Sequence, residues 1–251
     1  MTIYLSILII GNKKIMYLEK AMLKQVMVFM ISITFSTVLV AESLYVFVPT
    51  EVRANKLQQK IGSYCSGVDV TVFGRAKDFH NKVKAVPPTA ILSLLPVVEH
   101  TLSFNTAIMG LRDGLNSEGY VLVSIDRPMS LDSLNNKKIG VVDLLGRKPM
   151  RAFIEQLLKT EIMLKRVTKV EDLLPLITFE SVDAIFISES MFEQLKLKSK
   201  LKLVATPLNI NIGLASAALS DVIIKDQLKN CLYAFDKKLN STLGVDQWHT
   251  L

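Results

Sequence analysis

The chain has 251 residues, of which 50% are hydrophobic and 21% charged, so it is too apolar for a disordered protein; with 11 glycines and 8 prolines, it is not fibrous either. Its two cysteines cannot supply the disulfide framework of a miniprotein, so a packed core must stabilise it. The formal net charge of +7 is compatible with nucleic acid, a membrane surface or a small anion as partner and does not choose among them.

The amino-terminal part of the chain contains an uncharged apolar run at residues 26–41. Lys20 and Lys24 precede it, and Ala41 and Ser43 occupy the two positions that a signal peptidase reads when it cuts after Ser43; a cut after Ala41 is the second choice. The alternative is an uncleaved anchor, but the run is shorter than the roughly 20 residues of a spanning helix. Residues 1–43 are therefore predicted to be an upstream extension and a secretory signal peptide.

Export would place both cysteines, Cys65 and Cys231, in an oxidising compartment, where a disulfide between them is chemically permissible. The alternative is two separate buried thiols, because free cysteine is among the most buried residue types. Sequence does not place their Cα atoms, so both possibilities stay open.

From residue 44 onward, short β-rich runs alternate with amphipathic helical stretches. Strands are predicted at 44–48, 69–73 and 89–92, and helices at 51–64, after residue 73 and at 95–100. Two further strands, at 106–111 and 120–125, flank a turn-rich segment at 113–119.

The second half of the chain repeats this alternation of strands and helices. Strands are predicted at 138–142, 162–167, 183–187, 201–205 and 212–217, and helices at 149–158, 170–179, 189–195 and from 221 to about 238. Strand–helix alternation requires parallel strands joined by crossovers, so it predicts an α/β fold with helices on both faces of the sheets. The two sets are too small to be separate full-size domains and suit two lobes facing each other across a cleft.

The ends of the predicted strands indicate where a ligand would bind. Open parallel sheets bind ligands at the carboxyl ends of their strands, where helix N-termini present unpaired N–H groups. Those ends supply the candidate ligand-binding residues Thr50, Ser93, Arg147, Lys148 and Ser188. Hydroxyls at helix starts are also common N-caps, and exposed cations there are often only solvated, so a structural role stays open for each.

Three longer segments follow a family pattern. Residues 119–143 read GYVLVSIDRPMSLDSLNNKKIGVVD, residues 167–190 read VTKVEDLLPLITFESVDAIFISES, and residues 243–248 read LGVDQW. Together with the order of elements and the export signal, the chain from about residue 44 to residue 248 resembles the type II periplasmic solute-binding proteins of ABC transporters. The resemblance is greatest to the branch that binds phosphate, phosphite and phosphonate.

The resemblance implies a two-lobed periplasmic-binding-protein-like type II fold, in which each lobe is a mixed sheet flanked by helices and the ligand binds in the cleft. It implies a discontinuous lobe one, residues 44–120 and 207–251, and a contiguous lobe two, residues 121–206. The expected protein is a periplasmic monomer that captures a small polar, anionic solute and delivers it to an ABC permease. The alternative is a sensory or accessory binding protein of the same fold that signals to a membrane receptor.

One turn departs from the phosphonate binders, which carry a Ser-Thr-Ser-Gly type turn after the first strand of lobe two. This chain reads DLLGRK at residues 143–148, and no hydroxyl remains there. Phosphate or phosphonate is therefore not favoured as the ligand, although Arg147 and Lys148 could still bind an anion, the arginine through a bidentate fork.

The remaining polar residues do not indicate an enzyme. His80, His100 and His249 lack the spacing of a metal site. The sequence also has no Gly-x-Ser-x-Gly elbow and no Walker-type phosphate loop. We expect no catalytic residue, no metal, no cofactor and no nucleic-acid partner.

Overall fold

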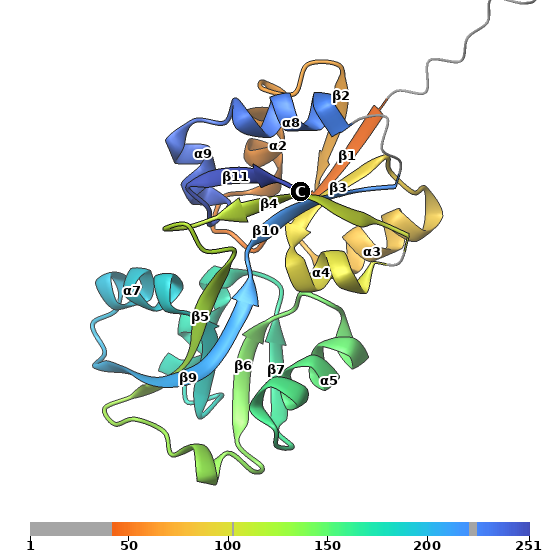
Figure 1. Cartoon of the computed structure of the whole chain (residues 1–251). Coiled ribbons are helices and arrows are strands. Elements are labelled where there is room, and N and C mark those ends of the chain that lie inside the picture. Colours follow the sequence, from red (N-terminus) through yellow and green to blue (C-terminus); the bar gives the residue numbers. More distant parts are fainter. Residues whose placement is uncertain (1–41, 102, 221–224) are drawn as a thin grey trace, which may run out of the picture. The chain divides into compact units, whose positions relative to one another are not determined.

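The computed structural model describes residues 42–101, 103–220 and 225–251. The predicted signal peptide lies outside these ranges except for Glu42 and Ser43, which belong to the first strand. Residues 41–251 form one compact unit (Figure 1). No helix within the described ranges is long and apolar enough to cross a membrane.

The first sheet is six-stranded, with the order β11-β4-β10-β3-β1-β2. Its strands are β1 (Glu42–Phe47), β2 (Val68–Val72), β3 (Ala90–Leu94), β4 (Asn105–Leu111), β10 (Ala215–Leu219) and β11 (Gln247–Thr250). The strands β1, β2 and β3 are parallel, whereas β10 and β11 run antiparallel to their neighbours. The accompanying helices are α2 (Ala54–Gly62), α3 (Ala76–Ala85), α4 (Leu95–His100), α8 (Lys225–Tyr233) and α9 (Lys237–Thr242).

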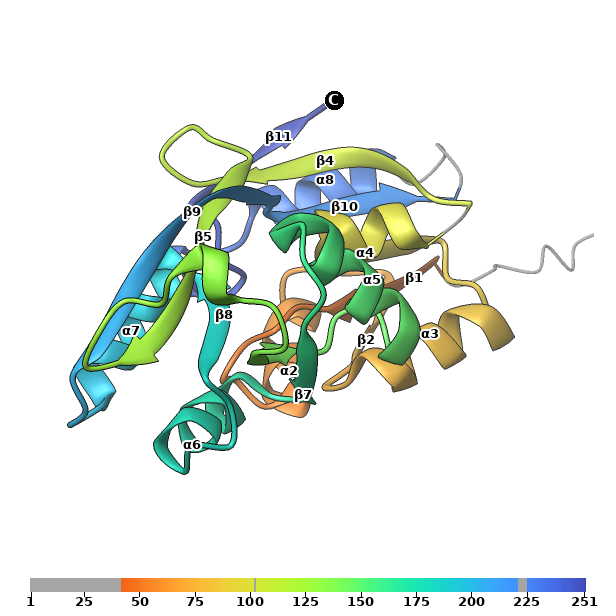
Figure 2. The ribbon, with the colours of Figure 1, turned by 90° about the horizontal axis from the view of Figure 1, so that it is seen from below.

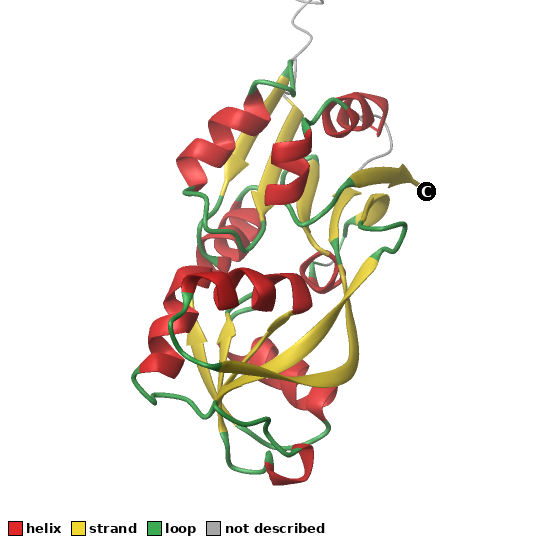
Figure 3. Ribbon diagram, turned by 90° about the vertical axis from the view of Figure 1, so that its left-hand side faces the viewer, coloured by secondary structure: helices red, strands yellow, loops and turns green. Residues whose placement is uncertain are grey.

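The second sheet is five-stranded, with the order β7-β6-β8-β5-β9. Its strands are β5 (Ser117–Ile125), β6 (Lys138–Val142), β7 (Met163–Val167), β8 (Ala184–Ser188) and β9 (Leu203–Gly213), and its helices are α5 (Arg147–Leu158), α6 (Leu173–Thr178) and α7 (Glu189–Lys198). β6 is parallel to both of its neighbours, and β5 is antiparallel to both of its own. Helices flank both mixed sheets (Figure 3), which confirms the predicted α/β class.

We call the six-stranded sheet with its helices lobe one, and the five-stranded sheet with its helices lobe two. The chain leaves β4 through a tight turn in which Arg112 and Leu115 exchange backbone hydrogen bonds around Asp113 and Gly114, both with positive φ. It returns from β9 to β10 at Leu214. The predicted lobe boundaries at residues 120 and 207 fall inside β5 and β9, whereas the sheets place the two crossings at 112–116 and at Leu214.

Alternation along each strand sends side chains to opposite helical layers. In lobe one, Leu44 and Val46 belong to the same buried cluster as side chains of α2, α8 and α9, whereas Tyr45 and Phe47 belong to the cluster of α3 and α4. In lobe two, Val121 and its same-face neighbours cluster with α6 and α7. The period-2 pattern of the sequence thus determines which helix covers which face.

One buried cluster contains side chains of both lobes. It joins Phe47 and Phe79 of lobe one to Leu144, Leu145 and Ile154 of lobe two. Leu144 and Leu145 are thereby buried between the lobes by apolar contacts.

The carboxyl-terminal part of the chain differs from prediction. The predicted helix from 221 to about 238 is wrong: the described residues form α8 and α9, separated by three residues, with the Asp236 carboxylate capping α9 through the Leu239 N–H. The predicted strand 201–205 is the first part of β9, which continues to Gly213. Strand β11 was not predicted from the sequence. Its Trp248 is buried, and the indole N–H donates to Asn240.

The two cysteines lie on neighbouring elements of lobe one. Cys65 follows α2 and Cys231 lies on α8, their Cα atoms are 4.7 Å apart, and the structure bonds them as a disulfide. Both belong to the buried cluster beneath β1. All sheet pairings and apolar clusters described here lie within residues 42–251, so this unit carries its own core.

Candidate functional site

A cavity of about 350 Å³ lies between the two lobes. Its walls come from the loop after β1, the start of β5, the first turns of α7, and α9 with the residues that follow it. The polar residues that line it are Thr50, Glu51, Arg112, Glu118, Tyr120, Ser188, Ser190, Gln194, Lys238, Ser241 and Thr242. Because both lobes contribute, a ligand in this cavity would touch both at once.

An ion pair forms one wall of the cavity at the crossing from β4 to β5. Arg112 Nη1 donates to Glu118 Oε1 over 2.8 Å, and the same oxygen accepts the backbone N–H of Ser190 over 2.9 Å. Only 27% of the arginine and 15% of the glutamate side chain is exposed, so water screens the pair less than it would a surface pair. Glu118 thereby ties the crossing segment to the start of α7.

The start of α7 presents hydroxyls to the cavity. Ser188 Oγ caps the helix by accepting the Met191 N–H over 3.4 Å and lies 3.3 Å from Ser190 Oγ. Beside them, Tyr120 packs on Phe186 with ring centroids 4.9 Å apart, and burial raises the pKa of the tyrosine above its ordinary value. This wall is therefore neutral and offers hydroxyl groups near a helix N-terminus.

The loop after β1, in lobe one, contacts α7 of lobe two at the edge of the cavity. Thr50 Oγ1 accepts the Val52 N–H over 3.2 Å, which shapes the loop. Next to it, both carboxylate oxygens of Glu51 accept from Lys198 Nζ at the end of α7. This pair is 40–50% exposed, so it marks an interlobe contact and adds little to stability.

The charges that line the cavity are two carboxylates, Glu51 and Glu118, and two cations, Arg112 and Lys238. Lys198 and Arg112 neutralise the two carboxylates. Among the described residues, no carboxylate lies within ion-pair distance of Lys238, which leaves one cation directed to the cavity without a protein partner of opposite charge.

The cavity brings together some of the predicted site residues. Thr50 and Ser188 both line it, although they are far apart in sequence. Ser93 does not: it is fully buried in β3, where its hydroxyl donates to the Phe47 carbonyl of the adjacent strand. Arg147 and Lys148 start α5 and are exposed; Arg147 lines a different cavity, and Lys148 lines neither.

Four charged lining residues, Arg112, Glu118, Lys238 and Glu51, were not predicted as site residues. Arg112 and Glu118 lie in or beside the segment assigned to a turn, and Lys238 in the segment assigned to one long helix. A signal was present for the first two, because opposite charges flank a chain crossing between lobes. No local pattern could have placed Lys238, since α9 reaches the cavity only through tertiary packing. No cluster of potential metal ligands occurs in the described parts of the chain.

No family model and no curated protein matches the chain. Solved structures do match. A Xanthomonas citri protein bound to ATP matches with 12% identity and a TM-score of 0.60 over 84% of this chain and 91% of its own. The VFT2 domain of BvgS from Bordetella pertussis matches with 12% identity and a TM-score of 0.54 over 82% and 93%.

An amino acid ABC transporter substrate-binding protein from Streptococcus pneumoniae, bound to L-arginine, matches with 14% identity and a TM-score of 0.54 over 80% and 91% of the two chains. Identities this low show a common fold only. The chain thus has the predicted two-lobed periplasmic-binding-protein-like fold, and the comparisons do not single out the phosphate, phosphite and phosphonate branch.

Proposed function

We propose that this protein is an exported solute-binding protein, which captures a small polar, anionic solute between its lobes and delivers it to a membrane permease. The observation that carries the proposal is the interlobe cavity, lined by residues of both sheets. A ligand that contacts both lobes binds more tightly when they are close together, so it shifts the population towards a closed form. A permease could distinguish that form from the empty one.

The anionic character of the solute follows from the partners of the lining charges. Glu51 and Glu118 each accept hydrogen bonds from a cation, whereas Lys238 has no carboxylate partner among the described residues. An anionic group of the solute would neutralise the Lys238 ammonium, and the hydroxyls of Thr50 and Ser188 would bind its polar groups. We therefore retain Thr50 and Ser188 as ligand-binding candidates for this cavity, and not Ser93, Arg147 or Lys148.

The proposal places the protein in the periplasm as a monomer, after removal of the predicted signal peptide. Its lobes would move about the two chain crossings, at residues 112–116 and at Leu214. Both crossings belong to neighbouring strands, since β5 and β9 pair from Ser117 and Gly213 onward, so one two-stranded ribbon would serve as the hinge.

A thermal-shift screen of purified residues 42–251 tests this function. The panel contains phosphate, phosphonates, amino acids and small carboxylates, because a ligand that binds only the native state raises the melting temperature by mass action. We expect a carboxylate-bearing or phosphate-bearing solute to do so, and small-angle scattering to show compaction when it binds.

Lys238→Ala should weaken that binding about tenfold or more, whereas Lys237→Ala, the adjacent lysine of α9 that does not line the cavity, is the matched control. If no compound in the panel shifts the melting temperature and none compacts the protein, the solute-binding proposal is wrong. If binding occurs but both lysine variants bind like the wild type, the cavity is not its site.

A further inference from the structure

A second cavity, of about 740 Å³, opens at the opposite edge of the interlobe region and shares no lining residue with the first. Helices α3 and α4 of lobe one border it on one side, and the start of α5 with β7 of lobe two on the other. Figures 1 and 2 show these helices on the same side of the ribbon. Its lining is strongly basic.

Side chains along one face of α3 form the lobe-one wall of the cavity. Lys77, His80 and Lys84 recur at positions i, i+3 and i+7 and therefore lie on one face of the helix, and all three line the cavity. Phe79 of the same helix is buried in the apolar cluster, and Val83 packs against that cluster while it also lines the cavity. Packing of the apolar face on β1 thus turns Lys77 and Lys84 towards lobe two.

The lobe-two wall contributes two arginines and one carboxylate. Arg147 begins α5, and Arg166 lies on β7. The carboxylate of Asp143 accepts from Arg166 Nη1 through one oxygen and from the Gly146 N–H, over 2.8 Å, through the other. No other carboxylate is found among the described residues that line the cavity, so four Lys and Arg cations face one carboxylate that is already engaged.

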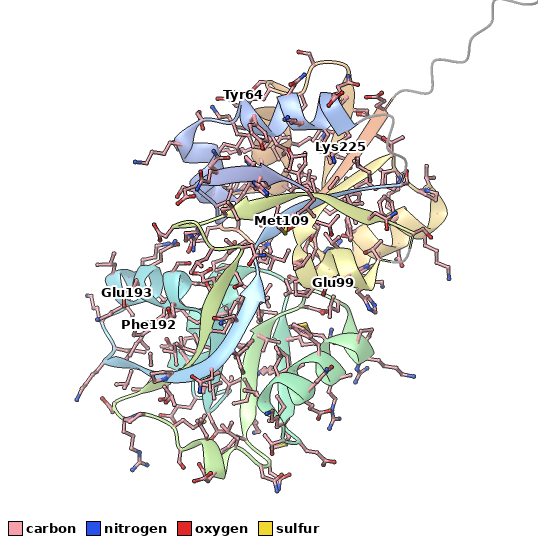
Figure 4. All side chains as sticks on the ribbon, in the orientation of Figure 1. Tyr64, Glu99, Met109, Phe192, Glu193 and Lys225 are labelled. Carbon is pink, nitrogen blue, oxygen red and sulfur yellow. A yellow bond between two sulfur atoms is a disulfide. The ribbon has the colours of Figure 1, made fainter. Side chains whose placement is uncertain are left out.

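Two histidines lie where the walls meet. His80 Nε2 is 3.2 Å from the Leu144 carbonyl oxygen of lobe two, a contact that fixes the distance between the walls. The His100 ring is 5.9 Å away, centroid to centroid. Burial is the main cause that lowers the pKa of His80, which favours the neutral ring. Glu99, labelled on α4 in Figure 4, does not line the cavity.

We propose that this basic cavity binds a small molecule with two or more phosphate groups and thereby bridges the two lobes. The cations come from both walls, so a monovalent anion would meet only one or two of them. Lys77, Lys84 and Arg147 are exposed, and the Arg166 side chain is 26% exposed. Each of these cations therefore attracts a single phosphate charge only weakly in water, and only a ligand of high charge gains from all of them together. Guanidinium groups bind phosphate oxygens through paired N–H donors, which suits Arg147.

The experiment titrates residues 42–251 with inorganic pyrophosphate by calorimetry. We expect saturable binding that weakens about tenfold or more between 50 and 300 mM NaCl, because several charges are neutralised. Lys77→Glu/Lys84→Glu should lose pyrophosphate binding by a factor of about ten or more. The matched control, Lys56→Glu/Lys82→Glu, makes the same charge change at exposed lysines that do not line the cavity, and it should bind nearly like the wild type.

The inference is overturned by no binding of pyrophosphate, by equal losses in both double variants, or by inorganic phosphate binding as tightly as pyrophosphate. Binding that is lost in Lys238→Ala but kept in Lys77→Glu/Lys84→Glu would assign pyrophosphate to the first cavity and also contradict it. The solute screen of the first cavity does not depend on Lys77 or Lys84, so each proposal can fail while the other holds.

Discussion

The carboxylate of Glu118 links the chain crossing between the lobes to the start of α7. Its Oε1 atom accepts from Arg112 at the chain crossing and from the Ser190 N–H at the start of α7, over 2.8 and 2.9 Å. A Cβ at Gly119 beside it would lie 2.9 Å from the carboxylate of Glu189, whose side chain would have to move. The polypeptide is therefore held at the crossing by the Glu118 contacts, which also border the interlobe cavity.

Asp236 gives a prediction about pH. Its carboxylate accepts from Lys60, from the Tyr64 hydroxyl and from the Leu239 N–H, and these hydrogen bonds, that of Lys60 first, lower its pKa to about 2. A depressed carboxyl pKa stabilises the fold fully above the unfolded pKa of about 3.9, and this contribution is lost as the pH falls towards 2.

Carbon-13 NMR of the Asp236 carboxyl should give a titration midpoint near 2. In Asp236→Asn, unfolding measured between pH 5 and pH 2 should lose part of its pH dependence. A midpoint at about 4 would contradict the hydrogen-bonding arrangement.

Gly110 gives a prediction about packing. A Cβ at this position in β4 would lie 2.3 Å from Val245 Cγ1 and 2.5 Å from the Ala215 carbonyl oxygen, and the latter belongs to the backbone of the adjacent strand. Gly110→Ala should therefore lower the free energy of unfolding by about 1–3 kcal/mol in urea denaturation.

The matched control is Gly62→Ala at the end of α2, where nothing lies within 4 Å of the added Cβ. It should be neutral or stabilise by up to about 1 kcal/mol, because alanine favours a helix more than glycine does. Equal effects of the two substitutions would show that β4 and β10 are not as close as described.

At the scale of elements, the disulfide between Cys65 and Cys231 ties α8 to the end of α2, across a sequence separation of 166 residues. A crosslink over so long a loop removes much conformational freedom from the unfolded chain. Cys65→Ala/Cys231→Ala should lower the free energy of unfolding by about 2–5 kcal/mol.

Peptide mapping without reductant checks the bond directly, since it should recover the two cysteine-containing segments as one crosslinked species. Thiol labelling of the denatured, unreduced protein should modify neither cysteine. Labelling of both would mean that the export prediction or the pairing is wrong.

The sequence predicted the bounds of an element well where local hydrophobic patterning and the flanking turn residues specify them. The strand at 138–142 and the helix at 95–100 have their predicted bounds, because alternation and flanking turn residues specify them locally. Prediction failed where distant contacts decide. The residues 234–236 interrupt a helical pattern because Asp236 meets Lys60 of α2, and β11 exists because β4 offers it an edge.

The residues of the candidate site also fall into those that local sequence rules predict and those that depend on distant contacts. Thr50 follows β1 and Ser188 ends β8, and both were predicted from the rule that ligands bind at strand ends. Ser93 lies near the end of β3 and obeys the same rule, but it is fully buried and its hydroxyl donates to the Phe47 carbonyl. Lys238 reaches the cavity from the last part of lobe one, and no spacing along the chain contains that information.

At the scale of the whole molecule, β1 distinguishes the two predicted signal-peptidase cuts. Ser43 exchanges hydrogen bonds with Thr89: its N–H donates to the threonine hydroxyl, its own hydroxyl accepts the Thr89 N–H, and its carbonyl accepts from the same hydroxyl. A cut after Ser43 would delete all three contacts, whereas a cut after Ala41 leaves β1 whole. We therefore predict that the mature chain begins at Glu42.

Intact-mass measurement of the protein expressed with its full amino-terminal segment, or sequencing of its first residues, tests that start. A mature chain that begins at Leu44 would show that β1 forms without its first two residues. An unprocessed chain would favour the membrane anchor instead.

The insertion of lobe two between β4 and β10 constrains the order in which the two sheets can be completed from the amino-terminal end of the chain. Strand β10 lies between β3 and β4 in the sheet, so β4 has no neighbour on that side until residues 215–219 are available. Lobe two has all five of its strands by residue 213 and can condense first. Lobe one, which contributes the first strand, is thus the last to be completed, and until then the facing edges of β3 and β4 are open to wrong pairing.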